Sequence, residues 1–291
     1  MKKILVLGGS GLVGSVFANY SQSNYDLHLT YNDNPIINQK INSTKINVTT
    51  QAFELKKLIL DISPDIIINT IAHSSVDLCE TNPHDADFLH VDIPKKILDF
   101  SSEIGSKLIY FSTDAVFPGE LNKKYNEDDI PNPVNYYGKT KLNAEKIILN
   151  HSQKNTVLRT AVIYGKHKRS RFTNWILSSL KNNQMVDPFI DQFNTPTLVD
   201  DIAKILIKII DENIYGLFHA AGPTCLNRYD FALLLAKYSK LDSQFIKPVT
   251  KNEKKQLATR PISTCLDSTK LEQLTKLKFS DITSGINQIL D

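Results

Sequence analysis

The chain has 291 residues, of which 41% are hydrophobic and 22% charged, and its formal net charge is +3 at pH 7. A chain of this length buries about three quarters of its unfolded surface, so it needs neither a structural metal nor a disulfide to fold. The small and scattered positive charge gives little support to nucleic acid as a partner, although it suits a phosphorylated ligand.

The apolar segments and the cysteines indicate the compartment. The apolar run of residues 4–7 stops at two glycines, too short for the core of a signal peptide or for a bilayer span, and no other stretch approaches that length. Cys79, Cys225 and Cys265 are odd in number and far apart. We therefore expect a cytoplasmic protein with reduced, unpaired thiols and no membrane partner.

Strand-like and helix-like segments alternate through the first half of the chain. Apolar runs predict strands at residues 3–7, 26–31, 45–48, 66–68, 108–111 and 157–158. Apolar residues at helical spacing predict helices at residues 12–20, 53–62, 88–100 and from about 135. This alternation predicts an α/β fold with a Rossmann-type, doubly wound parallel sheet.

Beyond residue 164 the alternation becomes irregular. The pattern predicts a helix at 172–180, turns at 191–197, a helix at 202–210, a strand at 217–220 and a helix at 228–238. We therefore predict an NAD(P)-binding domain over residues 1–165, to whose sheet residues 198–222 return. Residues 166–197 and 223–291 would form a smaller substrate-binding cap.

Three glycines follow the first predicted strand and open the first helix. Gly8 suits a tight turn, Gly11 leaves room for a diphosphate beside the backbone, and Gly14 lets the helix pack on the sheet. The helix would direct its unpaired amides and positive dipole end at the phosphates. A glycine turn with no ligand is the alternative, but the strand-to-helix context favours a dinucleotide site.

The end of the second predicted strand bears on which dinucleotide binds. A carboxylate at this place typically holds the ribose of NAD, and Thr30, Tyr31 and Asn32 provide none. No arginine is present there to hold a 2′-phosphate either. We favour NADP(H) and leave NAD(H) open.

Tyr137 and Lys141 lie four residues apart at the start of a predicted helix, so both side chains project from one face. A neighbouring ammonium favours the phenolate, and we expect Lys141 to lower the pKa of Tyr137 toward a useful range for acid–base catalysis. Ser112 and Thr113 end a buried strand, where a hydroxyl could hold a substrate carbonyl. Hydroxyls that only satisfy the local backbone are the alternative.

Several motifs in order resemble those of the extended short-chain dehydrogenase/reductase family. The similarity is greatest to its dTDP-4-dehydrorhamnose reductase group, which reduces a 4-keto nucleotide sugar with NAD(P)H. The motifs span the whole chain and lie at residues 64–69, 72–77, 112–119, 137–145, 191–197, 260–261 and 266–267. The resemblance implies a nucleotide-sugar reductase, and it leaves a homodimer open.

The resemblance also implies roles for individual residues. The catalytic trio would be Thr113, Tyr137 and Lys141. Together with the glycine turn, the cofactor set comprises Gly8, Ser10, Gly11, Leu12, Val13, Gly14, Asn47, Val48, Thr70, Ile71, Ala72, His73, Tyr137 and Lys141. The nucleotide sugar would contact Val76, Thr113, Asp114, Val162 and Arg260. For Arg260, a surface ion pair is the alternative to a contact with the diphosphate.

Some positions depart from the family pattern. Val162 stands where an aromatic residue often contacts the sugar, and His90 replaces an asparagine. His73 and His90 lack the further ligands of a metal site, so we predict no metal. The basic residues 167–171 could meet a substrate diphosphate, but we expect a solvated loop.

Two other functions remain open beside the reductase. The regulatory subunit of methionine adenosyltransferase resembles the same group, so this fold can serve assembly without turnover. A nucleotide-sugar dehydratase or epimerase is the second alternative. Dehydratases of the broad family need an acidic residue after the Thr-Asp pair, where this chain has Ala115.

Overall fold

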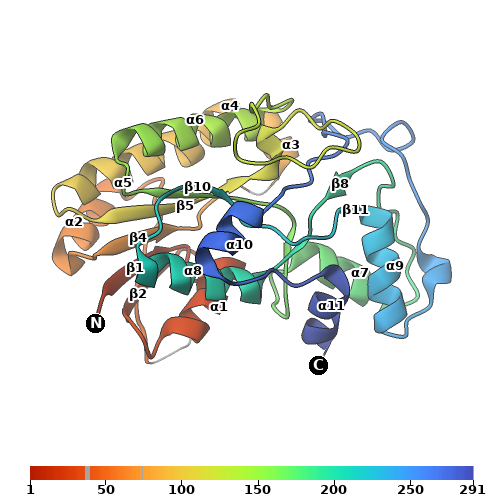
Figure 1. The fold of residues 1–291 in the computed structure, drawn as a ribbon, viewed down its shortest axis with the longest axis horizontal. Coiled ribbons are helices and arrows are strands. Elements are labelled where there is room, and N and C mark those ends of the chain that lie inside the picture. Colours follow the sequence, from red (N-terminus) through yellow and green to blue (C-terminus); the bar gives the residue numbers. More distant parts are fainter. Residues whose placement is uncertain (37–39, 74, 291) are drawn as a thin grey trace.

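The computed structural model describes residues 1–36, 40–73 and 75–290; Ser74, within one of the family motifs, lies outside them. In this part of the chain a seven-stranded sheet has the order β10-β6-β5-β4-β1-β2-β3, and all its neighbours are parallel (Figure 1). The strands are β1 (Lys3–Leu7), β2 (Asp26–Tyr31), β3 (Asn42–Lys45), β4 (Ile66–Asn69), β5 (Lys107–Thr113), β6 (Thr156–Thr160) and β10 (Gly216–His219). The predicted Rossmann-type, doubly wound sheet is confirmed.

Helices cover both faces of the sheet (Figure 1). One face packs against α1 (Leu12–Ser21), α8 (Val199–Glu212) and α10 (Thr269–Thr275). The other packs against α2 (Ala52–Ile62), α5 (Ile93–Ser102) and α6 (Tyr136–His151). Successive strand residues alternate between the two cores: Ile4 and Val6 face the first, whereas Leu5 and Leu7 face the second. Burial on both faces explains the continuous apolar runs of the strands.

The third strand lies earlier than predicted, at Asn42–Lys45 instead of residues 45–48. Its residues are polar because it is the edge strand, exposed to solvent beyond its pairing with β2. Ile46 and Val48, which suggested the strand, follow its end and are buried in the core under α2. The apolar signal therefore marks core packing rather than sheet pairing.

Short helical segments connect β4 to β5 across one face. They are α3 (Val76–Thr81), α4 (Pro83–Asp87) and the π-helical turn η1 (Phe88–Asp92), which continues directly into α5. A short 3-10 turn, η2 (Asp114–Val116), follows β5. Asn135 caps α6, since its side chain accepts the N–H of Gly138 at 2.9 Å.

The second half of the chain adds a smaller unit beside the sheet (Figure 1). Its core joins α7 (Arg171–Lys181), α9 (Arg228–Tyr238) and α11 (Ile282–Leu290). Short pairs of strands connect it to the sheet: β7 (Ile163–Tyr164) with β9 (Thr197–Leu198), and β8 (Phe193–Asn194) with β11 (Leu226–Asn227). The 3-10 turn η3 (Ser243–Phe245) completes it. The domain boundaries given above remain a prediction.

The expectation of three unpaired thiols is wrong. Cys225 and Cys265 form a disulfide across 40 residues of sequence, and their Cα atoms are 5.6 Å apart. They meet because the segments flanking them run together: β11 pairs with β8, and Phe193 of β8 also bridges to Ser263. Sequence spacing could not show this proximity. Cys79 is a free, buried cysteine.

Across residues 1–36, 40–73 and 75–290, no helix combines the length and the apolar character needed to cross a membrane.

Candidate functional site

Two cavities lie along the carboxyl ends of the strands, where open parallel sheets bind their ligands. The larger measures about 790 Å³ and lies between the sheet and the smaller unit. The smaller measures about 540 Å³ and lies over β1, β2 and β4. Gly11, Thr70, Ala72 and Arg169 line both cavities, so the two meet at the glycine turn. We call them the substrate cavity and the cofactor cavity.

The glycine turn has the shape that a dinucleotide requires. Gly8 has φ +85°, and a Cβ there would lie 2.6 Å from Thr70 Oγ1, so only glycine fits. A Cβ on Gly14 would lie 2.7 Å from the Gly8 carbonyl oxygen, which explains how α1 packs so closely. Gly11 caps α1 without a side-chain hydrogen bond, so no capping side chain occupies the first-turn amides beside the cavities. The turn thus fits a diphosphate.

Most of the predicted cofactor residues line the cofactor cavity, namely Gly8, Ser10, Gly11, Asn47, Val48, Thr70, Ile71, Ala72 and His73. Leu12 and Val13 line the substrate cavity beside Gly11. Asp33 also lines the cofactor cavity, two residues beyond the end of β2. This carboxylate, one residue beyond the Thr30–Asn32 segment in which none was found, would repel a 2′-phosphate and could bind a ribose hydroxyl.

Tyr137 lies half-buried in the wall of the substrate cavity, in the first turn of α6. Burial raises the pKa of its phenol well above 10, and hydrogen bonding with the Thr113 side chain opposes the rise. The expectation that Lys141 lowers this pKa is not met, because burial dominates the environment of the phenol. A phenol with a high pKa is protonated at neutral pH and can therefore donate a proton.

Lys141 lies one helical turn behind Tyr137 and is fully buried. Its ammonium donates to the Phe111 carbonyl at 2.5 Å and lies 4.1 Å from the centroid of the Tyr110 ring. Burial lowers the pKa of Lys141 to about 7, while nearby Glu145 acts to raise it. Lys141 lines neither cavity, so in this structure it lies beneath the site.

The hydroxyls at the end of β5 differ in their surroundings. The Ser112 hydroxyl donates to the buried Glu145 carboxylate, and Ser112 also lines the substrate cavity. The Thr113 hydroxyl donates to the Asp114 carboxylate at 3.1 Å and accepts the Ala115 N–H at 3.1 Å. Both Thr113 and Asp114 line the substrate cavity. Both hydroxyls are thus hydrogen-bonded to a carboxylate at the cavity wall, and the choice of Thr113 as the carbonyl donor stays a prediction.

Asp114 is held by a ring of donors. Its carboxylate accepts hydrogen bonds from Asn194 at 2.6 Å and from the Thr264 hydroxyl, in addition to Thr113. Burial raises its pKa, and these hydrogen bonds oppose the rise. Asn194 and Thr264 belong to the smaller unit, so their hydrogen bonds to Asp114 connect the end of β5 to the smaller unit.

His90 connects the two halves of the site from the π-helical turn. Its Nε2 accepts the His73 N–H at 2.9 Å, so the ring proton is on Nδ1, which donates to Thr140 Oγ1 at 2.8 Å. The ring packs edge-on against Tyr137 with centroids 5.5 Å apart. Burial lowers the pKa of His90 to about 3, so it is neutral. His90 therefore positions residue 73 and the Tyr137 turn against each other.

Val76 and Val162, for which contact with the sugar was predicted, also line the substrate cavity. Val162 has φ +42°, a left-handed conformation that is costly for a β-branched residue. Neighbouring bonds hold it there: the Val162 carbonyl accepts the Thr197 N–H at 3.2 Å, and the Thr197 hydroxyl donates to the Ala161 carbonyl at 2.9 Å.

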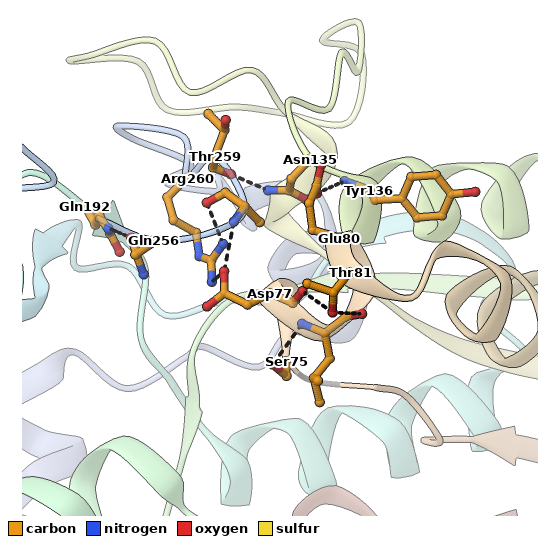
Figure 2. A network of polar contacts seen from close by, with 12 residues as sticks. Ser75, Asp77, Glu80, Thr81, Asn135, Tyr136, Gln192, Gln256, Thr259 and Arg260 are labelled. Carbon is orange, nitrogen blue, oxygen red and sulfur yellow. Dashed lines mark hydrogen bonds and ion pairs between the residues drawn. The ribbon is translucent and has the colours of Figure 1, made fainter. Parts of the chain in front are cut away.

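Arg260 forms an ion pair, which was one of its two predicted interpretations, and its contact with a diphosphate stays a prediction. Its guanidinium pairs with the Asp77 carboxylate of α3 at 3.0 Å (Figure 2). Arg260 also lines the substrate cavity. Two further contacts hold the segment around it: the Asn135 side chain donates to the Thr259 carbonyl at 2.9 Å, and Gln192 donates to Gln256 at 2.5 Å (Figure 2). The segment containing Arg260 thus closes one side of the cavity.

Three arginines outside the predicted site residues also stand at the substrate cavity, and two of them belong to the basic run 167–171. Arg169, Arg171 and Arg228 all line the substrate cavity, and the described residues offer none of them an ion-pair partner within 4.0 Å. Of the two arginines in the loop of residues 167–171, Arg171 is exposed, as expected for a solvated loop, whereas Arg169 is half-buried. Their cationic character next to a predicted phosphate site was the available signal, whereas nothing in the sequence pointed to Arg228.

No cluster of three or more His, Cys, Asp or Glu residues capable of holding a metal ion occurs in the described ranges.

Comparison with known proteins shows the family to which the chain belongs. The family model described as the RmlD substrate binding domain matches residues 1–291. The dTDP-4-dehydrorhamnose reductase of Aggregatibacter actinomycetemcomitans is 29% identical over 303 residues, which cover 99% of this chain and 98% of that protein. Methionine adenosyltransferase 2 subunit beta of Bos taurus is 31% identical over 299 residues, covering 99% and 87%. The predicted family resemblance is confirmed.

Solved structures show the same fold. A hypothetical dTDP-4-dehydrorhamnose reductase from Sulfolobus tokodaii is 28% identical with a TM-score of 0.86, over 98% of this chain and 99% of that one. A dTDP-4-dehydrorhamnose reductase from Bacillus anthracis, in complex with NADP, has a TM-score of 0.88 at 24% identity, over 99% of each chain. At that identity the second likeness concerns the fold alone.

Proposed function

Because this chain belongs to the family defined by the RmlD substrate binding domain, we propose that it is an NAD(P)H-dependent reductase of the 4-keto group of a nucleotide-linked 6-deoxy sugar. One observation carries the proposal. A phenol protonated at neutral pH and the threonine hydroxyl hydrogen-bonded to it, those of Tyr137 and Thr113, lie in a cavity that continues into the glycine turn.

The chain's own residues divide the work of this reaction. Thr113 would orient the sugar carbonyl, and Tyr137 would protonate the alkoxide as it forms. A high phenol pKa suits this direction, because the acid form is needed and the alkoxide is the stronger base. The Lys141 side chain would turn from the Phe111 carbonyl toward the ribose attached to the nicotinamide ring and would hold that ribose. The bound dinucleotide supplies the hydride.

The charge of the substrate cavity supports a nucleoside diphosphate as the handle of the sugar. Arg171, Arg228 and Arg260 line this cavity, and fork-shaped guanidinium groups match phosphate oxygens. Trp175 lies at the same wall with 40% of its surface exposed, where its ring could stack on a base.

The cofactor cavity suits a nicotinamide dinucleotide. We expect NADP(H) to be preferred, because Tyr31 and Asn32 offer no carboxylate that would repel its 2′-phosphate. Asp33, at the same cavity, acts in the opposite direction and favours NAD(H). Titration of NADPH and NADH, followed by cofactor fluorescence, measures the balance between them.

A second candidate is a regulatory subunit that binds the cofactor without turnover, since the subunit beta of methionine adenosyltransferase 2 is 31% identical. The protein should be incubated with NADPH and a panel of nucleotide-linked 4-keto-6-deoxy sugars. Steady NADPH consumption with one member supports the reductase. Tight NADPH binding without consumption across the panel would refute it and favour the regulator.

A further inference from the structure

The loop between β7 and α7 lies against the phosphate-binding turn, although the two are more than 150 residues apart in sequence. His167 is the point of attachment. Its Nδ1 accepts the Arg169 N–H at 3.1 Å, so its proton lies on Nε2, which donates to the Ser15 hydroxyl at 3.2 Å. The Ser15 hydroxyl in turn donates to the Gly11 carbonyl at 2.6 Å. A chain of hydrogen bonds thus links Gly11 to Arg169.

The rest of the loop is held just as firmly. Ser170 is completely buried, and its hydroxyl accepts the Gly165 N–H at 3.0 Å. The Asn174 side chain donates to the His167 carbonyl at 2.9 Å, and the Ser170 N–H donates to the same carbonyl at 3.0 Å. The backbone that carries Arg169 is therefore fixed relative to α1.

This backbone places the Arg169 side chain where the two cavities meet. Arg169 lines both of them, together with Gly11, Thr70 and Ala72. Its side chain is half-buried, and no carboxylate within the described residues lies within 4.0 Å of its guanidinium. The glycine turn offers amides to a diphosphate from one side, and an uncompensated guanidinium stands at the same junction.

We propose that Arg169 binds the diphosphate of the dinucleotide, and that His167 is a positioning residue that holds Arg169 over the glycine turn. The inference rests on the proposed function, because it takes the cofactor cavity as a dinucleotide site. It adds a second wall to that site, supplied by the loop of residues 165–170.

The test measures dinucleotide binding without substrate or turnover. Arg169→Gln should raise the dissociation constants of NADPH and NADH by the same factor, about 10- to 100-fold, because both carry the diphosphate. Lys168→Gln is the matched control: it removes the same charge from the next position, which is exposed and lines neither cavity. It should change neither constant by more than about twofold.

His167→Ala tests the positioning role in a double-mutant cycle. Alone it should weaken both dinucleotides, and added to Arg169→Gln it should have little further effect, since it acts through the same guanidinium. Additive effects would overturn this role. Thermal unfolding of each variant checks that the fold is retained.

Three results would overturn the assignment of Arg169. The first is that Arg169→Gln changes the dissociation constants of NADPH and NADH no more than Lys168→Gln does. The second is that Arg169→Gln weakens binding of NADPH alone, which indicates a 2′-phosphate contact. The third is that Arg169→Gln weakens binding of UDP and dTDP and leaves binding of both dinucleotides unchanged. Each leaves the proposed reductase standing. If the unaltered protein binds neither dinucleotide, the proposed function fails and the inference fails with it.

Discussion

Replacement of Lys141 by methionine should change stability in a pH-dependent way. Burial lowers the pKa of Lys141 to about 7 from an ordinary value of 10.5. Between these pH values the unfolded chain holds a proton that the folded protein has released. The free energy of unfolding of the unaltered protein therefore rises with pH by about 1.4 kcal/mol per pH unit. From pH 7 to 10 this contribution amounts to roughly 4 kcal/mol, and below pH 7 it changes no further.

Methionine carries no proton, so the Lys141→Met variant lacks this dependence. Its advantage in free energy of unfolding over the unaltered protein should be greatest near pH 7 and shrink as pH rises toward 10. Urea unfolding at pH 7, 8 and 9 measures the difference, and Lys139→Met, at an exposed position of the same helix, is the control. A difference between Lys141→Met and the unaltered protein that stays constant over this range would refute the reasoning.

Three further changes test the framework around the site. Replacing Cys225 and Cys265 by serine should lower the free energy of unfolding by about 4 kcal/mol, from the 40-residue loop that the disulfide closes; a melting temperature insensitive to reductant would contradict this. Glu145→Ala should cost about 3–5 kcal/mol, because it leaves the Arg159 guanidinium, 3% exposed and 2.7 Å from Glu145, buried without its partner. The double replacement of Glu145 by Leu and Arg159 by Met should recover much of the lost free energy of unfolding, as measured by urea unfolding. Gly14→Ala should weaken NADPH binding at least tenfold, since a Cβ there meets backbone at 2.7 Å; unchanged fluorescence titration would count against this.

The sequence predicted the sheet well because its signals are local. The strands around Ile67 and Leu108 are buried on both faces, so their sequences are short apolar runs that predict buried strands. The edge strand failed for the opposite reason. Its residues are polar, and the apolar Ile46 beside it belongs to the helix–sheet core.

The site was predictable where neighbouring residues carry it and not where the fold brings distant ones together. Tyr137 and Thr113 stand in motifs whose spacing indicates their place. Arg228 has no such motif, and it reaches the cavity through the packing of α9 against α7. The pKa of Tyr137 escaped prediction because it depends on burial, which no spacing reveals.

The central claim is that Tyr137 donates the proton in a dinucleotide-dependent ketone reduction. The most direct measurement compares NADPH consumption by the unaltered protein and by Tyr137→Phe, with a nucleotide-linked 4-keto sugar, alongside NADPH binding. We expect turnover to fall by about 100-fold or more while the NADPH dissociation constant stays within about twofold. Equal turnover in the two proteins would contradict the account.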